Sequence, residues 1–167
     1  MAETITTVRV DLVPLRVDHA EEMAVVLSDP ALHAFTGGAP DTPGALRERY
    51  QRLGAGSPDP AVSWLNWVIR IRDEKHLAGT VQATIGHFDG GARAEIAWVV
   101  GTPWQGRGVA TEAARALVAW LGRQDVRTVM AHIHPEHHAS AAVAAACGLA
   151  PGDEWQDGER RWLRRTG

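Results

Sequence analysis

Residues 98 to 113 read WVVGTPWQGRGVATEA, and this stretch decides the fold. A strand-like apolar segment gives way to a loop, and a helix begins at two glycines, Gly106 and Gly108. The first N–H groups of a helix have no internal partners and carry partial positive charge. Because glycines leave these groups open, the stretch favours an anion site, typically for a diphosphate. An apolar stripe at helical spacing predicts the helix, at Ala110, Ala113, Ala114, Leu117, Val118 and Leu121.

The segment before this loop predicts three antiparallel strands. Residues 65–72 and 77–85 alternate with period two, and residues 94–100 form the next strand after the turn signal Asp89-Gly90-Gly91. Short connections between consecutive strands are typical of an antiparallel meander.

The remaining elements follow from their boundary residues. We expect an edge strand over 8–15, a helix capped by Asp18 and Glu21 that runs to Leu27, and a helix from Pro43 to Leu53. Gly122 should end the striped helix, and a strand over 126–133 and a helix over 139–147 follow. Asp157-Gly158 predicts a closing hairpin.

Together these elements predict one α/β (α+β) domain over residues 1–167. Its mixed, mostly antiparallel central sheet should have about six to seven strands, with helices on both faces.

Composition excludes several function classes. The 17 basic and 20 acidic residues give a net charge of −3, which argues against a nucleic-acid binder held by bulk charge. No Gly-Lys-Ser/Thr triplet is present, so a P-loop is excluded. The single Cys147 allows no internal disulfide, and neither a signal peptide nor a membrane span is evident. We therefore expect a cytoplasmic protein that binds neither nucleic acid nor membrane.

Two glycines alone have a simpler interpretation, in which they only shape a strand-to-helix turn. The dinucleotide-binding fingerprint fits poorly, because its third small position falls on Thr111 and the preceding strands are expected to be antiparallel.

A resemblance to a known family gives the expected anion site a specific interpretation. Gln105-Gly106-Arg107-Gly108-Val109-Ala110 is similar to the Gln/Arg-x-x-Gly-x-Gly/Ala signature of the GNAT superfamily of N-acetyltransferases. Downstream, Ile133-x-Pro135-Glu136-x-x-x-Ser140 resembles a motif of the Rim-type branch, which acetylates the N-termini of ribosomal proteins. The predicted element order also matches the GNAT fold over nearly the whole chain.

The resemblance implies acetyl-CoA as co-substrate and assigns residues to it. In the family, the signature's backbone holds the diphosphate and the preceding strand pairs with the pantetheine arm, much as a peptide adds to a sheet edge. Carried over, the strand residues are Val99 and Val100. The phosphate loop comprises Gln105, Gly106, Arg107, Gly108, Val109, Ala110 and Thr111.

The chain also departs from the family pattern. His137, counted here among the coenzyme-binding residues, stands where the family usually has an asparagine. Ala144 replaces the tyrosine that protonates the departing thiolate in many GNAT enzymes. Ser140 matches the Rim-type serine and is the candidate for contacting the thiolate, although serine is also a favoured helix N-cap. Both interpretations of Ser140 stay open.

Acyl transfer needs the acceptor amine as free base. At pH 7 deprotonation costs roughly 1 kcal/mol for an α-amine and about 4.6 kcal/mol for a lysine side chain. Glu95 is the candidate base, directly or through a water, because it lies on the strand face of Ala97 and Val99 and matches a strand glutamate of several GNAT enzymes. The simpler alternative is a carboxylate paired with Arg93 or Arg70.

Two residue clusters remain. Histidines at 132, 134, 137 and 138 could bind a metal, but they lack cysteine or paired carboxylate neighbours, so structural or substrate-lining roles are favoured and no metal is expected. The C-terminal arginines at 160, 161, 164 and 165 predict a solvated face paired with Asp153 and Glu154. A contact with an acidic surface or the coenzyme's 3′-phosphate is the alternative.

The sequence thus favours acetyl transfer to a primary amine by direct attack in a ternary complex. The acceptor could be a protein N-terminus or a small amine such as an antibiotic or polyamine, and the net charge of −3 favours a cationic one slightly. A non-catalytic acyl-CoA-binding sensor is the alternative from another class. A free strand edge or the closing hairpin could support a homodimer.

Overall fold

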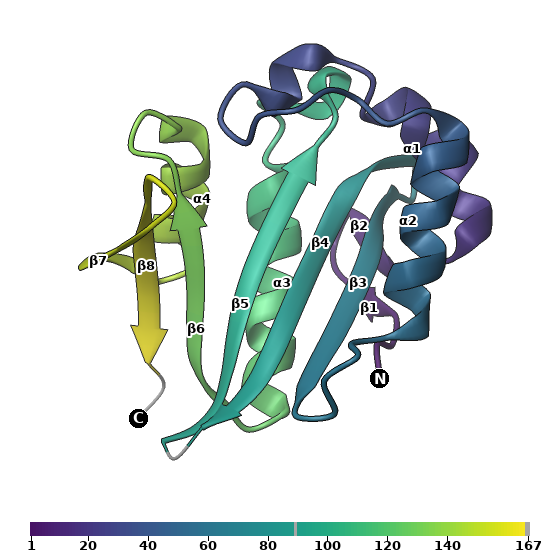
Figure 1. Ribbon diagram of the computed structural model, residues 1–167. Coiled ribbons are helices and arrows are strands. Elements are labelled where there is room, and N and C mark those ends of the chain that lie inside the picture. The colour runs from purple at the N-terminus through teal and green to yellow at the C-terminus, as the bar shows by residue number, and fades with distance from the viewer. Residues whose placement is uncertain (89, 166–167) are drawn as a thin grey trace.

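A computed structural model describes residues 1–88 and 90–165 and forms one eight-stranded sheet in the order β1-β2-β3-β4-β5-β6-β8-β7 (Figure 1). The strands are β1 Ile5–Thr6, β2 Val10–Pro14, β3 Val62–Ile71, β4 His76–Phe88, β5 Gly91–Val100, β6 Val126–Ile133, β7 Ala150–Gln156 and β8 Glu159–Arg165. The helices are α1 Ala20–Val26, α2 Pro43–Ala55, α3 Val109–Arg123 and α4 His138–Ala146, and the 3₁₀ turns are η1 Val17–His19, η2 Pro30–His33 and η3 Thr102–Trp104.

The predicted mixed, mostly antiparallel sheet is confirmed. All neighbouring strands run antiparallel except β5 and β6, which are joined by the crossover helix α3. The meander from β3 to β5 follows from the period-two alternation of its residues. The predicted turn residue Asp89 lies outside the described residues.

Helices cover both faces of the sheet, as predicted. Along β3, the buried side chain of Val68 packs with Ala20, Met23, Leu46 and Tyr50 of α1 and α2. Its neighbours Trp67 and Ile69 belong instead to the cluster that contains α3 and α4. Because successive side chains of a strand point to opposite faces, the two helix pairs lie on opposite sides of the sheet.

Several predicted boundaries are wrong. The strand that ends at Pro14 is not at the edge, because the chain turns back after residue 6 and β1 pairs outside it. Asp18 does not cap α1; it lies within η1 and forms an ion pair with Arg16. Gly122 stays inside α3, which ends at Arg123. By contrast, Thr42 caps α2 just before Pro43, and Asp157 and Gly158 both have positive φ in the closing hairpin.

Among the described helices, none combines the length and the apolar character needed to cross a bilayer.

Tyr50 carries a polar group into the core without a hydrogen-bond partner among the described residues. Its side chain is buried under α1, and its hydroxyl has no hydrogen-bond partner among the described residues. Burial, the largest influence, raises the pKa of Tyr50 to about 12. Burial of the apolar ring therefore stabilises the fold, whereas the hydroxyl loses its hydrogen bonds to water and gains none from the protein.

Replacing Tyr50 with phenylalanine should preserve the packing and remove the unpaired hydroxyl. We expect the free energy of unfolding to stay constant or rise by up to about 1 kcal/mol, measured by urea denaturation. Tyr50→Leu, which loses ring contacts, serves as the control and should destabilise. A drop of more than 1 kcal/mol for Tyr50→Phe would mean that the hydroxyl has a stabilising partner.

Candidate functional site

The site forms where β5 and β6 part. The two parallel strands pair only from Ala92 to Glu95 of β5, with Val126 to Met130 of β6. Beyond this point Ile96–Val100 keep their pairing with β4 but have none with β6, which continues alone beside β8. Figure 1 shows the two strands diverging toward their carboxyl ends. One edge of β5 therefore presents backbone N–H and C=O groups that the sheet does not use.

Close backbone packing fixes the end of β5. A Cβ atom at Gly79 of β4 would lie 2.1 Å from the carbonyl oxygen of Val99, so only glycine fits at that position. After the strand, the Gly101 N–H donates to Ala78 O at 2.7 Å. A Cβ at Gly101 would meet Val26 O of α1 at 2.7 Å. Both glycines allow neighbouring backbones to approach and hold the strand end in place.

The loop after β5 presents backbone amides at the start of α3. Gly106 and Gly108 have φ values of +75° and +77°, the left-handed region that glycine adopts without strain. The first helical bond runs from Glu112 N–H to Gly108 O at 3.0 Å, and no side chain caps the helix. The N–H groups of Val109, Ala110 and Thr111 thus have no helical acceptor and can bind an anion.

Side chains anchor the loop from two sides. The Gln105 amide donates to Val100 O at 2.9 Å and joins the loop to the strand end. On the far side, Arg107 forms an ion pair with Glu74, whose second oxygen accepts from Trp104 Nε1 at 3.0 Å. The hydrogen bond from Arg107 is the largest influence that lowers the pKa of Glu74. Trp104 therefore supports the loop.

The first turn of α3 is tied to the N-terminal strands. Arg9 Nε donates to the Glu112 carboxylate at 2.8 Å, and its NH1 donates to Arg107 O at 2.9 Å. Partial burial acts to raise the pKa of Glu112, but hydrogen bonds from Thr7 and Arg9 outweigh it, so the pKa is lowered. A charged Glu112 therefore fixes the helix start, and the helix amides remain available to a ligand.

Across the gap, His137 directly precedes α4. The ring Nδ1 accepts from Ser140 N–H at 3.3 Å, Nε2 lies 3.1 Å from Ser140 Oγ, and Phe35 stacks on the ring at a centroid distance of 4.5 Å. His137, and not Ser140, is the helix N-cap, so the capping interpretation of Ser140 is wrong. Burial, followed by the charge of His134, lowers the pKa of His137.

Glu95 lies at the last paired position of β5 and bonds to His132, one of the clustered histidines, in a contact that the sequence does not predict. Its Oε1 is 2.6 Å from Nδ1 of His132 on β6. The His132 side chain is only 7% exposed, whereas that of Glu95 is 46% exposed and open to a substrate. Arg161 Nε on β8 donates to His132 Nε2 at 3.2 Å. Period-two alternation puts Glu95 and His132 on strand faces, but only the tertiary fold shows that the two strands are neighbours.

The direction of these bonds defines the state of His132. Arg161 can only donate, so the His132 Nε2 that faces it must be an acceptor. The ring proton then resides on Nδ1 and is donated to Glu95. His132 is therefore a neutral ring held between a cation and a carboxylate, and it orients the carboxylate at the gap.

Two further residues that the sequence singles out lie in the core. Cys147 is buried, and burial raises the pKa of its thiol to about 11, so it is not a reactive nucleophile. Ala144 is fully buried in the core. Within residues 1–88 and 90–165, no group of three or more His, Cys, Asp or Glu side chains is arranged to hold a metal ion.

Comparisons with known proteins agree with this geometry. The family model described as an acetyltransferase (GNAT) domain matches residues 9–150. No curated protein matches the sequence.

Solved structures share the fold at low identity. RimL, a ribosomal L7/L12 alpha-N-protein acetyltransferase in complex with coenzyme A, has a TM-score of 0.79 at 17% identity and covers 98% of each chain. A GNAT-family acetyltransferase from Bacillus anthracis has a TM-score of 0.78 at 19% identity, again over 98% of each chain. The microcin C7 self-immunity acetyltransferase MccE, in complex with acetyl-CoA and AMP, gives 0.77 at 16% identity over 96% of this chain and 94% of its own.

Gly79→Ala should displace the end of β5. The added methyl group would overlap the Val99 carbonyl, so we expect a loss of about 3 kcal/mol in the free energy of unfolding. Gly122→Ala is the matched control: its Cβ meets nothing within 4 Å, and alanine favours the helix, so stability should stay equal or rise. Equal stability of Gly79→Ala and wild type in denaturant titrations would contradict the close approach.

Proposed function

The chain belongs to the GNAT acetyltransferase family, and we infer from this that it is an acetyl-CoA-dependent N-acetyltransferase acting on a primary amine. The observation that carries the inference is the family match over residues 9–150, which includes the open edge of β5 and the amide-lined start of α3. No observation favours the alternative of a non-catalytic acyl-CoA sensor.

The unpaired backbone groups fit the coenzyme chemically. The N–H groups from Gly106 to Thr111 would bind the diphosphate of acetyl-CoA, since the space around the Cβ position of Gly106 is open to a ligand. The edge of β5 at Val99 and Val100 would pair with the pantetheine amides as an added strand does. Gln105 and Arg107 would act through the loop conformation, because their side chains are engaged by Val100 O and Glu74.

The reaction requires transfer of one proton from the amine and one to sulfur. In a ternary complex, the amine nitrogen attacks the thioester carbonyl carbon, the C–N bond forms and the C–S bond breaks. Glu95 accepts the proton that the amine loses, directly or through a water. Ser140 or a water supplies a proton to the thiolate, and solvent then returns a proton to the donor and takes the one held by Glu95. No covalent intermediate on the protein is needed.

His132 is the positioning residue for Glu95 in this proposal. Its Nδ1–H donates to one carboxylate oxygen and leaves the other oxygen for the amine. His137 has a parallel role for Ser140. Its Nδ1 accepts from the Ser140 N–H, so in the neutral ring Nε2–H faces Ser140 Oγ and leaves the hydroxyl proton available for sulfur. The lowered pKa of His137 favours this neutral ring.

The setting of the reaction is also a proposal. We place the whole of residues 1–167 in one domain, because both buried clusters share a single sheet. The free, buried Cys147 is compatible with a reducing compartment, which supports the cytoplasm. The edge strands β1 and β7 offer routes to a homodimer.

Glu95→Gln tests the proposed base. We expect kcat to fall by roughly 10²–10³-fold at pH 7 with acetyl-CoA affinity unchanged, because glutamine keeps the shape but accepts no proton. For an α-amine acceptor the deficit should shrink above about pH 8, where the free amine is abundant. Thiol release and calorimetry give the two quantities.

Glu48→Gln on α2 is the matched control, since this exposed carboxylate lies outside the site and the same neutralisation there should leave kcat unchanged. A wild-type kcat in Glu95→Gln at pH 7 would exclude Glu95 as the base.

A further inference from the structure

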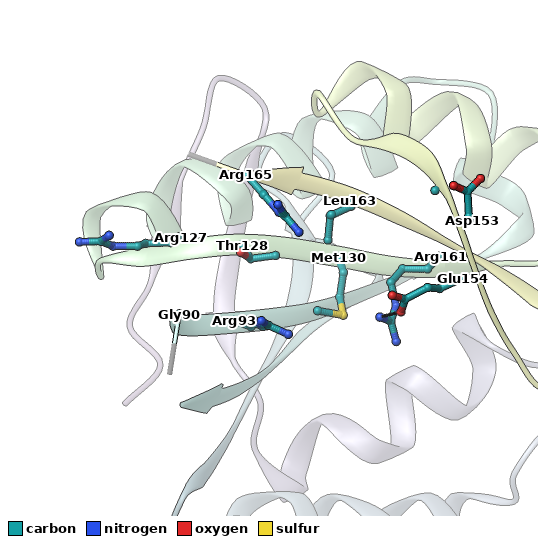
Figure 2. Close-up of a pocket in the computed structure, with 11 residues that line it drawn as sticks. Gly90, Arg93, Arg127, Thr128, Met130, Asp153, Glu154, Arg161, Leu163 and Arg165 are labelled. Carbon is teal, nitrogen blue, oxygen red and sulfur yellow. Dashed lines mark hydrogen bonds and ion pairs between the residues drawn. The ribbon is translucent and has the colours of Figure 1, made fainter. Parts of the chain in front are cut away.

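A cavity of about 520 Å³ opens on the sheet (Figure 2), and Met130, the β6 register partner of Glu95, lines it. Ala94 and Ile96 belong to the buried cluster that contains α3 and α4, so the alternate side chains of Arg93 and Glu95 point to the opposite face. Side chains of β5, β6 and the closing hairpin line it. The strand register explains the arrangement: Arg93, Thr128 and Arg165 form one row across β5, β6 and β8. The next row holds Glu95, Met130 and Leu163. Figure 2 shows Arg93, Met130 and Arg161 around the same space.

Positive charge dominates this cavity. Among the described residues that line it, four are arginines, at positions 93, 127, 161 and 165, and two are carboxylates, Asp153 and Glu154. Glu154 is already paired with Arg161. The local excess is thus opposite in sign to the net charge of −3 for the whole chain. A concave surface with one sign of charge concentrates ligands of the other sign.

The cavity is connected to the proposed base. Arg161 lines the cavity and also donates to His132, which in turn binds Glu95. Arg93 lies two residues from Glu95 on the same strand face, a separation of roughly 7 Å. When an acceptor amine reaches Glu95 from this side, the chemical groups next to the amine on the same molecule therefore lie near these arginines.

We propose that the cavity is the acceptor pocket and that it selects amines whose neighbouring groups carry a carboxylate or a phosphate. This inference rests on the proposed acetyltransferase function and names its substrate class. Guanidinium groups bind both anions, in favourable cases through two parallel hydrogen bonds. The pocket therefore counters the slight preference for cationic acceptors that the overall charge suggests.

An acceptor panel at saturating acetyl-CoA tests the proposal. Three N-terminal serine hexapeptides carry Asp, Asn or Lys at positions 2 to 4, so that charge changes at nearly constant size. Phosphoethanolamine and ethanolamine form the small-molecule pair. We expect kcat/KM to be at least about tenfold higher for the Asp peptide than for the Asn peptide, and lowest for Lys. The advantage should fall with added salt.

The two arms distinguish the source of the anion. A gain for phosphoethanolamine over ethanolamine would support a small anionic amine, and a gain confined to the Asp peptide would support an acidic N-terminus. Equilibrium titration of the Asp and Lys peptides provides a second readout that requires no turnover.

The variant Arg165→Glu tests whether the preference for the Asp peptide arises in this cavity. Arg165 is exposed on β8 and lies outside the proposed catalytic group. The variant should lose about tenfold in kcat/KM for the Asp peptide and little for the Asn peptide, with unchanged acetyl-CoA affinity. Arg123→Glu, at the end of α3 and outside the cavity, carries the same charge change and should behave as wild type. Arg127→Gln is the second pocket variant if Arg165→Glu folds poorly.

Equal kcat/KM and equal affinity for the Asp, Asn and Lys peptides, together with equal kcat/KM for phosphoethanolamine and ethanolamine, would overturn the pocket assignment while leaving the acetyltransferase function intact. An Asp preference that Arg165→Glu and Arg127→Gln both retain would overturn it as well. Failure of the wild-type chain to bind acetyl-CoA would instead overturn the proposed function, and this inference with it.

Discussion

The incomplete pairing of β5 with β6 is the constraint on which the rest of the site depends. Backbone polar groups in a protein interior need partners, and a full parallel ladder would supply them along the whole of β5. Here the ladder stops at Glu95 and Met130, and the last residues of β5 keep one unused edge. The crossover to β6 then places the start of α3 just beyond the end of this edge. The sheet edge and the helix start thus both offer backbone donors and acceptors that the sheet and the helix do not use.

The two faces of the sheet differ in polarity. The α3 and α4 face is filled by the larger apolar cluster, which includes Leu117 and Leu121, and supplies most of the buried surface. The opposite face is covered by α1 and α2 over the early strands only. Over β5, β6 and β8 it carries Glu95, His132 and the arginines. The apolar core therefore lies on one face of the sheet and the candidate site on the other. The site can be polar because the core on the opposite face supplies the apolar packing.

Local patterns predicted most of the fold. The period-two run in residues 65–72, the stripe from Ala110 to Leu121 and the Asp157-Gly158 turn each encode structure within a few residues. The glycine signature of the loop after β5 is also local and can be read from sequence, while its role in binding phosphate stays a prediction. Errors arose where partners are distant: Pro14 seemed to end an edge strand because β1 could not be foreseen.

The same limit applies to the site. Glu95 was identified on its strand, but its bond to His132 depends on which strands become neighbours. Serine commonly caps helices, which suggests that role for Ser140, whereas the His137 ring, packed on Phe35, takes the cap position. Gly79 gave no signal, since the Val99 carbonyl that requires it belongs to another strand.

The most direct test of diphosphate binding by the loop amides compares the acetyl-CoA affinities of two variants at Gly106 whose side chains have the same shape. Position 106 has open space around its Cβ and a φ of +75°, which asparagine and aspartate tolerate better than most residues. Gly106→Asn and Gly106→Asp differ only in charge. If the loop amides bind the diphosphate, calorimetry should give at least about tenfold weaker binding for Asp than for Asn. Equal affinities for the two variants would contradict the account.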